Sequence, residues 1–235
     1  MFLEKTLQSV INQTYNNVEY IVIDGGSKDG TIDIIKNNTS NINYWISEPD
    51  NGIYDAMNKG LSIAKGDYVC FLNAGDSFQS SSTLTNLAEE LKSRGLPDII
   101  YGETDLVNSN GEVISKRRLK APQILTWKSF RMGMLVCHQA FFVKRDIAPE
   151  YDLQYRFSSD FDWCIRCMKK SEEIVNSKMR LINYLYEGTT TANRKASLKE
   201  RYTIMCKYYG TIPTQIRHLW FAVRFYYAKL FRNNI

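Results

Sequence analysis

Apolar residues in the first hundred positions alternate between short continuous runs and longer stretches with helical spacing. Strand-like runs occupy residues 18–23, 42–47, 68–72 and 98–101, and helical spacing occupies residues 1–12, 53–64 and 82–94, with another helix starting at residue 31. β-Branched residues dominate the first run, as in strands that are buried on both faces of a parallel sheet. The alternation predicts an α/β fold, with a mostly parallel central sheet flanked by helices.

The second half of the chain continues with strand-like segments and ends in helices. Residues 104–119 are rich in strand formers around an NSNG turn, residues 139–144 form an apolar run, and residues 161–170, 197–208 and 213–233 have helical patterns. A chain of 235 residues can bury one sizeable core. We therefore predict a main domain at residues 1–195 and a C-terminal helical extension at residues 196–235.

Polar turns directly follow two of the predicted strands. Residues 24–31 (DGGSKDGT) come after the first run, and residues 73–76 (NAGD) come after the central one. Ligands of open α/β sheets bind beyond the carboxyl ends of the strands, and glycine lets the backbone approach a ligand closely. Asp24, Gly25 and Asp76 are therefore candidate binding residues on two turns that should converge.

Charge and cysteine content narrow the function classes. The net charge of +5 falls short of a nucleic-acid-binding signature, because the basic residues are spread along the chain until the C-terminal segment. Five cysteines are an odd number, which fits reduced thiols in the cytoplasm.

No apolar run reaches the roughly 20 residues that cross a bilayer. A Rossmann-type dehydrogenase is excluded, because no GxGxxG pattern follows the first strand.

The last predicted helix mixes aromatic residues with cations between His218 and Arg232. A helix of this composition can lie on a membrane surface, pack against the domain or form an oligomer face. We expect contact with the membrane surface.

Three segments, in this order, resemble family 2 glycosyltransferases of the GT-A fold, in particular the bacterial enzymes of capsule, colanic-acid and O-antigen assembly. They are residues 24–31 (DGGSKDGT), 51–60 (NGIYDAMNKG) and 66–76 (GDYVCFLNAGD). The resemblance covers nearly the whole chain and implies an inverting transferase that moves a sugar from a nucleotide diphosphate donor to a glycan acceptor. It further implies a lipid-linked acceptor, bacterial surface polysaccharide synthesis and a place at the inner face of the cell membrane.

The resemblance implies a pocket for the nucleotide-sugar donor. In this pocket Asp24 and Gly25 would contact the base or the ribose, and Asn73 would face the ribose. Asp55 and Asn58 would line the same pocket, or would be ordinary polar residues of a helix face.

The resemblance also implies a divalent metal, Mn²⁺ or Mg²⁺, which prefers carboxylate oxygens together with substrate phosphate. Many relatives carry DADD at the second turn, whereas this chain has NAGD, with Asp76 as the single carboxylate. Asp76 is therefore the expected metal ligand, and the depleted turn predicts weak metal affinity.

Inverting transfer needs a general base that takes the proton of the acceptor hydroxyl. In the family this base is an aspartate at the start of a helix, and Asp160 falls at that place, with Asp162 as the alternative. His138, in a Cys-His-Gln segment, is expected near the donor sugar and the acceptor, although a lone histidine is equally often a core or surface residue. Arg194, after a late Gly-containing loop, is expected to contact phosphate; a plain surface loop is the alternative.

The start of the chain raises a second hypothesis. In the family a strand precedes the opening helix, whereas here the helix at residues 1–12 comes before the first visible strand, so the first strand is expected to be missing. Its loss would remove one wall of the nucleotide pocket. The alternative function is a non-catalytic GT-A-fold partner subunit of a polysaccharide assembly complex, or an N-terminally truncated inactive form.

Overall fold

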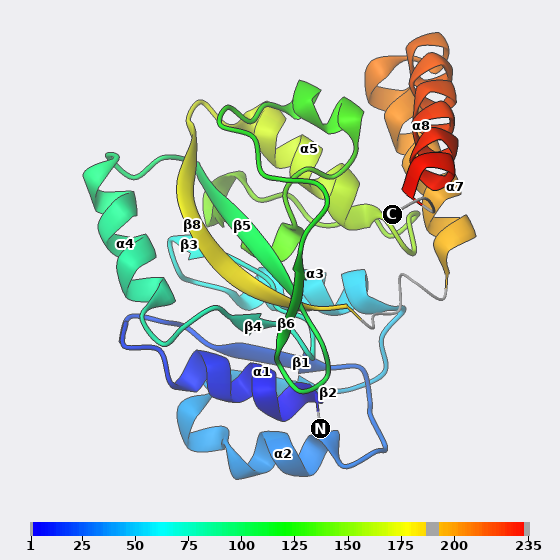
Figure 1. The fold of residues 1–235 in the computed structure, drawn as a ribbon. Coiled ribbons are helices and arrows are strands. Elements are labelled where there is room, and N and C mark those ends of the chain that lie inside the picture. Colours follow the sequence, from blue (N-terminus) through cyan, green and yellow to red (C-terminus); the bar gives the residue numbers. More distant parts are fainter. Residues whose placement is uncertain (1, 187–192, 233–235) are drawn as a thin grey trace.

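The computed structural model describes residues 2–186 and 193–232 (Figure 1). Its α-helices are α1 (Phe2–Ile11), α2 (Thr31–Asn37), α3 (Ile53–Ile63), α4 (Thr83–Ser93), α5 (Ser159–Lys170), α7 (Arg194–Tyr209) and α8 (Thr211–Arg232). Its strands are β1 (Ile21–Asp24), β2 (Tyr44–Ser47), β3 (Tyr68–Val69), β4 (Ser77–Phe78), β5 (Ile99–Val107), β6 (Val113–Lys116), β7 (Phe141–Lys144) and β8 (Ile174–Leu185). The helices and most strands read from the sequence are therefore confirmed, with ends that differ by a few residues.

The strands form two sheets. β1 and β2 pair in parallel, with Val22 opposite Trp45. The second sheet has the order β3-β7-β5-β8-β4, and β6 pairs with the free end of β5. Only β5 and β8 run parallel in this second sheet, while its other pairs are antiparallel.

The prediction of a mostly parallel sheet is therefore wrong, although the α/β class is confirmed. A parallel pair needs a long crossover connection, usually a helix, whereas an antiparallel partner can be reached without one. The chain enters β7 through residues 117–140, which contain 3₁₀ turns such as Trp127–Met132 and no α-helix. The direction of β7 is set by this connection, which the strand pattern itself does not encode.

The two sheets are held together by side chains rather than by ladder hydrogen bonds. On α1, the Thr6 hydroxyl donates to the Asp76 carbonyl over 2.7 Å and accepts from the Gly75 amide over 2.9 Å. The Glu19 carboxylate accepts from the amides of Lys65 and Gly66, just before β3. In the described part of the chain β1 has β2 as its one ladder partner.

The largest core cluster lies between the second sheet, α3, α5 and α7. Trp163 of α5 is fully buried and stacks on Tyr151 with a centroid distance of 4.9 Å. α7 adds Ile204 and Met205 to the same core. The C-terminal helices start at Arg194 and pack side by side next to α5 (Figure 1). No helix among the described residues is long and apolar enough to span a bilayer.

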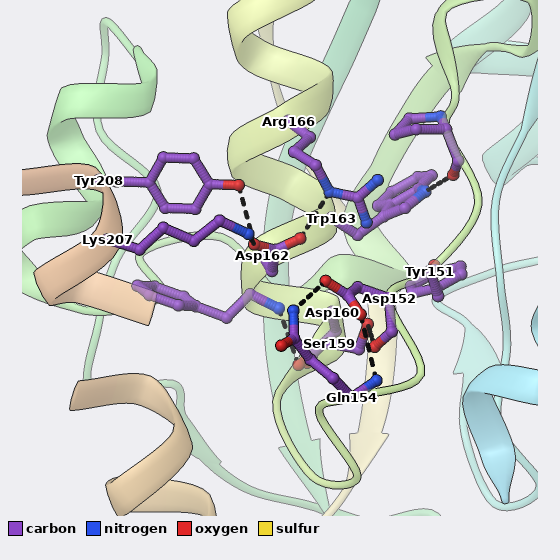
Figure 2. A network of polar contacts seen from close by, with 12 residues as sticks. Tyr151, Asp152, Gln154, Ser159, Asp160, Asp162, Trp163, Arg166, Lys207 and Tyr208 are labelled. Carbon is purple, nitrogen blue, oxygen red and sulfur yellow. Dashed lines mark hydrogen bonds and ion pairs between the residues drawn. The ribbon is translucent and has the colours of Figure 1, made fainter. Parts of the chain in front are cut away.

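A buried carboxylate joins α5 to α7. The Asp162 side chain is fully buried and accepts hydrogen bonds from Arg166 Nε at 2.5 Å, Lys207 Nζ at 3.2 Å and the Tyr208 hydroxyl at 2.8 Å. Figure 2 shows Asp162 between Arg166 on its own helix and the two side chains of α7. Both carboxylate oxygens are engaged in the interior, which argues against Asp162 as the general base.

We expect Asp162→Ala to lower the free energy of unfolding by about 3 kcal/mol, because it leaves two cations without their buried counter-charge. Tyr208→Phe removes one hydrogen bond to the same carboxylate and should cost about 1.5 kcal/mol. Urea unfolding measures both values, and hydrogen exchange of the α7 amides should rise more in Asp162→Ala. Equal losses in the two variants would contradict an anchoring role for the charge.

Candidate active site

Asp160 lies at the start of α5, with its side chain 14% exposed. Its Oδ1 accepts hydrogen bonds from the Tyr54 hydroxyl at 3.0 Å and from the Phe161 amide at 2.9 Å. The turn that carries it is itself fixed, because the buried Ser158 hydroxyl lies 3.0 Å from that of Ser197 on α7. The predicted base is thus held on a rigid helix end, with one oxygen occupied.

His138 lies beside Asp160, in the 3₁₀ turn His138–Ala140. Its Nδ1 is 3.6 Å from Asp160 Oδ2, and its Nε2 is buried without a hydrogen-bond partner. Burial lowers the pKa of His138, although the nearby Asp160 opposes this shift. The imidazole is therefore neutral at pH 7 and leaves Asp160 without a strong ion pair. Two of the predicted site residues are brought together here.

Asp76 lies in a buried network next to this pair. Its Oδ2 accepts from Gln139 Nε2 at 2.7 Å and its Oδ1 accepts from the Leu185 amide at 3.0 Å. Gln139 Oε1 in turn accepts from the Cys137 thiol. Burial raises the pKa of Asp76 to about 6, against the lowering effect of its hydrogen bonds.

The surroundings of Asp76 do not fit a divalent metal. Both carboxylate oxygens already accept hydrogen bonds, and the residue is only 3% exposed. Among the described residues no group of three or more carboxylate, histidine or cysteine side chains comes together. A hard cation needs several oxygen ligands. The NAGD turn thus directs its one carboxylate inward, and a metal-ligand role for Asp76 stays a prediction that this arrangement does not support.

Asp24, at the end of β1, is engaged by its own turn. Its carboxylate accepts from the Ser27 hydroxyl and the Ser47 hydroxyl, both at 2.6 Å, and from two backbone amides of the turn. Burial raises the pKa of Asp24, but these hydrogen bonds outweigh it and leave the pKa below its ordinary value. A Cβ at Gly25 would overlap the Asp50 carboxylate, so a larger residue here would displace the Asp50 side chain. Nucleotide contact by Asp24 and Gly25 stays a prediction.

The other predicted donor residues also make internal contacts. Asn58 binds the backbone of Tyr151 twice, donating to its carbonyl over 3.0 Å and accepting from its amide over 2.6 Å. Asp55 accepts from the Asn51 amide at the start of α3, which is a common helix-capping contact. Asn73 is half-buried in the NAGD turn. A nucleotide role for these three side chains stays a prediction.

Two described residues near Asp160 were not found from the sequence. Tyr54 was not singled out from the sequence; its ring is buried on α3, and its hydroxyl reaches Asp160. Arg117 donates to the carbonyls of Met134 and Leu135, on the segment that leads to His138. No sequence signal marked Arg117. The predicted phosphate contact, Arg194, begins α7, but its side chain and the loop at residues 187–192 lie outside the described residues.

Known proteins with similar sequences are glycosyltransferases. The PGL/p-HBAD biosynthesis glycosyltransferase of Mycobacterium bovis strain BCG is 33% identical over 175 residues, which cover 70% of this chain and 64% of that protein. The amylovoran biosynthesis glycosyltransferase AmsB of Erwinia amylovora is 27% identical over 191 residues, covering 76% and 64%. The chain thus spans 64% of the length of each of these relatives.

Solved structures of transferases share the fold. TarS 1-349 of S. aureus in complex with UDP-GlcNAc superposes with a TM-score of 0.67 at 18% identity, covering 87% of this chain and 60% of that one. The mannosyltransferase PcManGT of Pyrobaculum calidifontis in complex with GDP-Man and Mn²⁺ gives 0.61 at 15% identity, covering 88% and 59%. The expected GT-A transferase fold is confirmed by this likeness.

The family described as "Glycosyl transferase family 2" matches residues 2–151, more than half of the chain. This range includes all three segments that carried the resemblance, and with the relatives it shows that the chain belongs to glycosyl transferase family 2.

Proposed function

We propose that this chain catalyses inverting sugar transfer from a nucleoside diphosphate sugar to a glycan acceptor, with Asp160 as the general base. The observation that carries the proposal is the carboxylate at the start of α5. Tyr54 and the Phe161 amide hold Oδ1, and Oδ2 faces the neutral His138 across 3.6 Å. A carboxylate that is oriented through one oxygen can accept a proton at the other.

In the proposed reaction the acceptor hydroxyl oxygen attacks the anomeric carbon of the donor sugar. Its proton passes to Asp160 Oδ2 while the bond between the sugar and the diphosphate breaks. The nucleoside diphosphate leaves with the electron pair, and the configuration at the anomeric carbon is inverted. Because the described Asp76 does not fit a metal, no step is routed through one.

The donor class is supported by two solved structures with a similar fold, which hold UDP-GlcNAc or GDP-Man. A role in the biosynthesis of a glycan is supported by relatives named for amylovoran and PGL/p-HBAD biosynthesis. The proposal adds a lipid-linked acceptor used in surface polysaccharide synthesis at the inner membrane face.

A second candidate function is a non-catalytic partner subunit. The observation that favours it is that Asp24 and Asp76, at the two strand ends, both accept internal hydrogen bonds on each carboxylate oxygen. Such a protein would lack transfer, and its Asp160 would have no catalytic role.

Asp160→Asn keeps the shape of the side chain but cannot accept the proton. We expect transfer to fall roughly 10²–10⁴-fold, while UDP or GDP raises Tm as in the wild type, because donor binding is intact. Nucleoside diphosphate release from a panel of nucleotide sugars and glycan acceptors measures transfer. Asp33→Asn, in the first turn of α2, is the matched control and should change neither value.

The wild-type results separate the two candidate functions. No Tm shift and no nucleoside diphosphate release would sink the transferase proposal and favour the partner subunit. Normal transfer by Asp160→Asn, in an active wild type, would reject the base assignment alone.

Tyr54→Phe removes the hydroxyl that orients Asp160 and keeps the buried ring. We expect kcat to fall about tenfold with an unchanged KM for the donor, since the change affects positioning of the base. Tyr68→Phe is the control, because the Tyr68 hydroxyl donates to the Pro97 carbonyl away from Asp160. Both variants should lose about 1 kcal/mol of stability. An equal kcat loss in the two variants would show a merely structural role for Tyr54.

The free energy of unfolding of Asp76→Asn, relative to that of the wild type, should increase as pH rises. The pKa of the buried carboxyl is raised from 3.8 to about 6, so the folded state binds the proton more tightly than the unfolded state does. This group therefore favours folding most at low pH, and the advantage is lost as pH rises from about 4 to 6, by about 3 kcal/mol in total. Urea unfolding of both proteins between pH 4 and 7 measures the difference. A constant difference would mean that Asp76 titrates normally.

A further inference from the structure

Helix α8 has one face against the protein and an opposite face that is open. Thr214 is fully buried, and His218 packs edge-on against Tyr202 of α7 with a centroid distance of 5.2 Å. The open face carries large apolar side chains, which we call the α8 apolar stripe: Ile212, Ile216, Leu219, Trp220 and Val223, each at least 52% exposed. Their spacing of three and four residues places them on one side of the helix.

The charged residues of the same region are all basic. Residues 201–235 contain six Lys and Arg residues and no Asp or Glu. The rest of the chain, with 24 basic and 25 acidic residues, is close to neutral, so the excess positive charge of the protein lies in its C-terminal helices. Four of the six basic residues lie in the sequence of α8, so an apolar stripe and a purely cationic charge occur in one helix.

We propose that the α8 apolar stripe docks on an anionic lipid bilayer surface. Apolar and aromatic side chains can enter the interfacial region while the cations of the same segment attract anionic headgroups. A second copy of this chain would bring the four cations of one α8 toward the four of the other, which opposes pairing through this face. A nucleic acid would satisfy the cations but would leave the stripe in water.

The anchor between α5 and α7 ties this surface to the candidate active site. Asp162 binds Lys207 and Tyr208, and Asp160 lies two residues earlier on the same helix. A bilayer on α8 would therefore hold Asp160 at a fixed distance from the lipid surface. That docking brings Asp160 near a lipid-linked acceptor rests on the proposed function. The docking of α8 on a bilayer does not depend on sugar transfer.

The test is co-sedimentation of the full chain, without donor, with vesicles of phosphatidylcholine alone or mixed with phosphatidylglycerol. We expect binding to the mixed vesicles that weakens as NaCl is raised, and little binding to phosphatidylcholine alone. Ile216→Glu combined with Leu219→Glu should weaken binding at least roughly tenfold, since two apolar groups of the stripe are lost and two negative charges are added.

The control is Val113→Glu combined with Ile124→Glu, which makes the same charge change at exposed apolar residues outside α8. This variant should bind nearly as the wild type does, and Tm values should show that both double variants are folded. The proposal is overturned if the wild type does not bind the mixed vesicles, or if the control loses binding equally. It is also overturned if light scattering shows a wild-type dimer that the α8 variant dissociates. Loss of transfer without loss of vesicle binding would count against the proposed function alone.

Discussion

The arrangement of the candidate active site depends on the buried carboxylate of Asp162, whose negative charge must be compensated. Asp162 is fully buried, and a carboxylate in the interior is tolerated only with counter-charges and hydrogen bonds, which Arg166, Lys207 and Tyr208 supply. Residues two positions apart on a helix point about 200° apart. Once Asp162 is turned toward α7, Asp160 must therefore face the opposite side, where Tyr54 and His138 lie. One ionic requirement sets both the place of the C-terminal helices and the direction of the candidate base.

The Cys-His-Gln segment links the two carboxylates that matter most. Within three successive residues, His138 lies beside Asp160 and Gln139 binds Asp76. The bond between Gln139 and Asp76 satisfies polar groups of both buried side chains, which would cost free energy if left unpaired. The segment thus fixes the distance between the strand end at Asp76 and the helix start at Asp160. The segment therefore has a structural role that does not depend on contact with a substrate.

Local patterns predicted the helices and the hairpin turn, because apolar spacing and turn residues are properties of neighbouring positions. The choice of Asp160 came from the resemblance to family 2 glycosyltransferases. Strand direction was missed, since the pairing of β7 with β5 depends on a connection without α-helix rather than on the strands. The inward turn of Asp76 was also missed. It depends on Gln139 and Leu185, far away along the chain, and only the fold brings these donors to the carboxylate.

The uneven charge of the chain has a consequence before any contact is made. A nearly neutral body with a cationic end is an electric dipole, and a dipole turns in the field of a charged surface. This field reaches about 8 Å at physiological ionic strength. Molecules of this protein that come near an anionic surface would thus first rotate into a common orientation, with α8 facing the surface. Long-range electrostatics would select the orientation, and the apolar side chains would then have to act only over the last few ångströms.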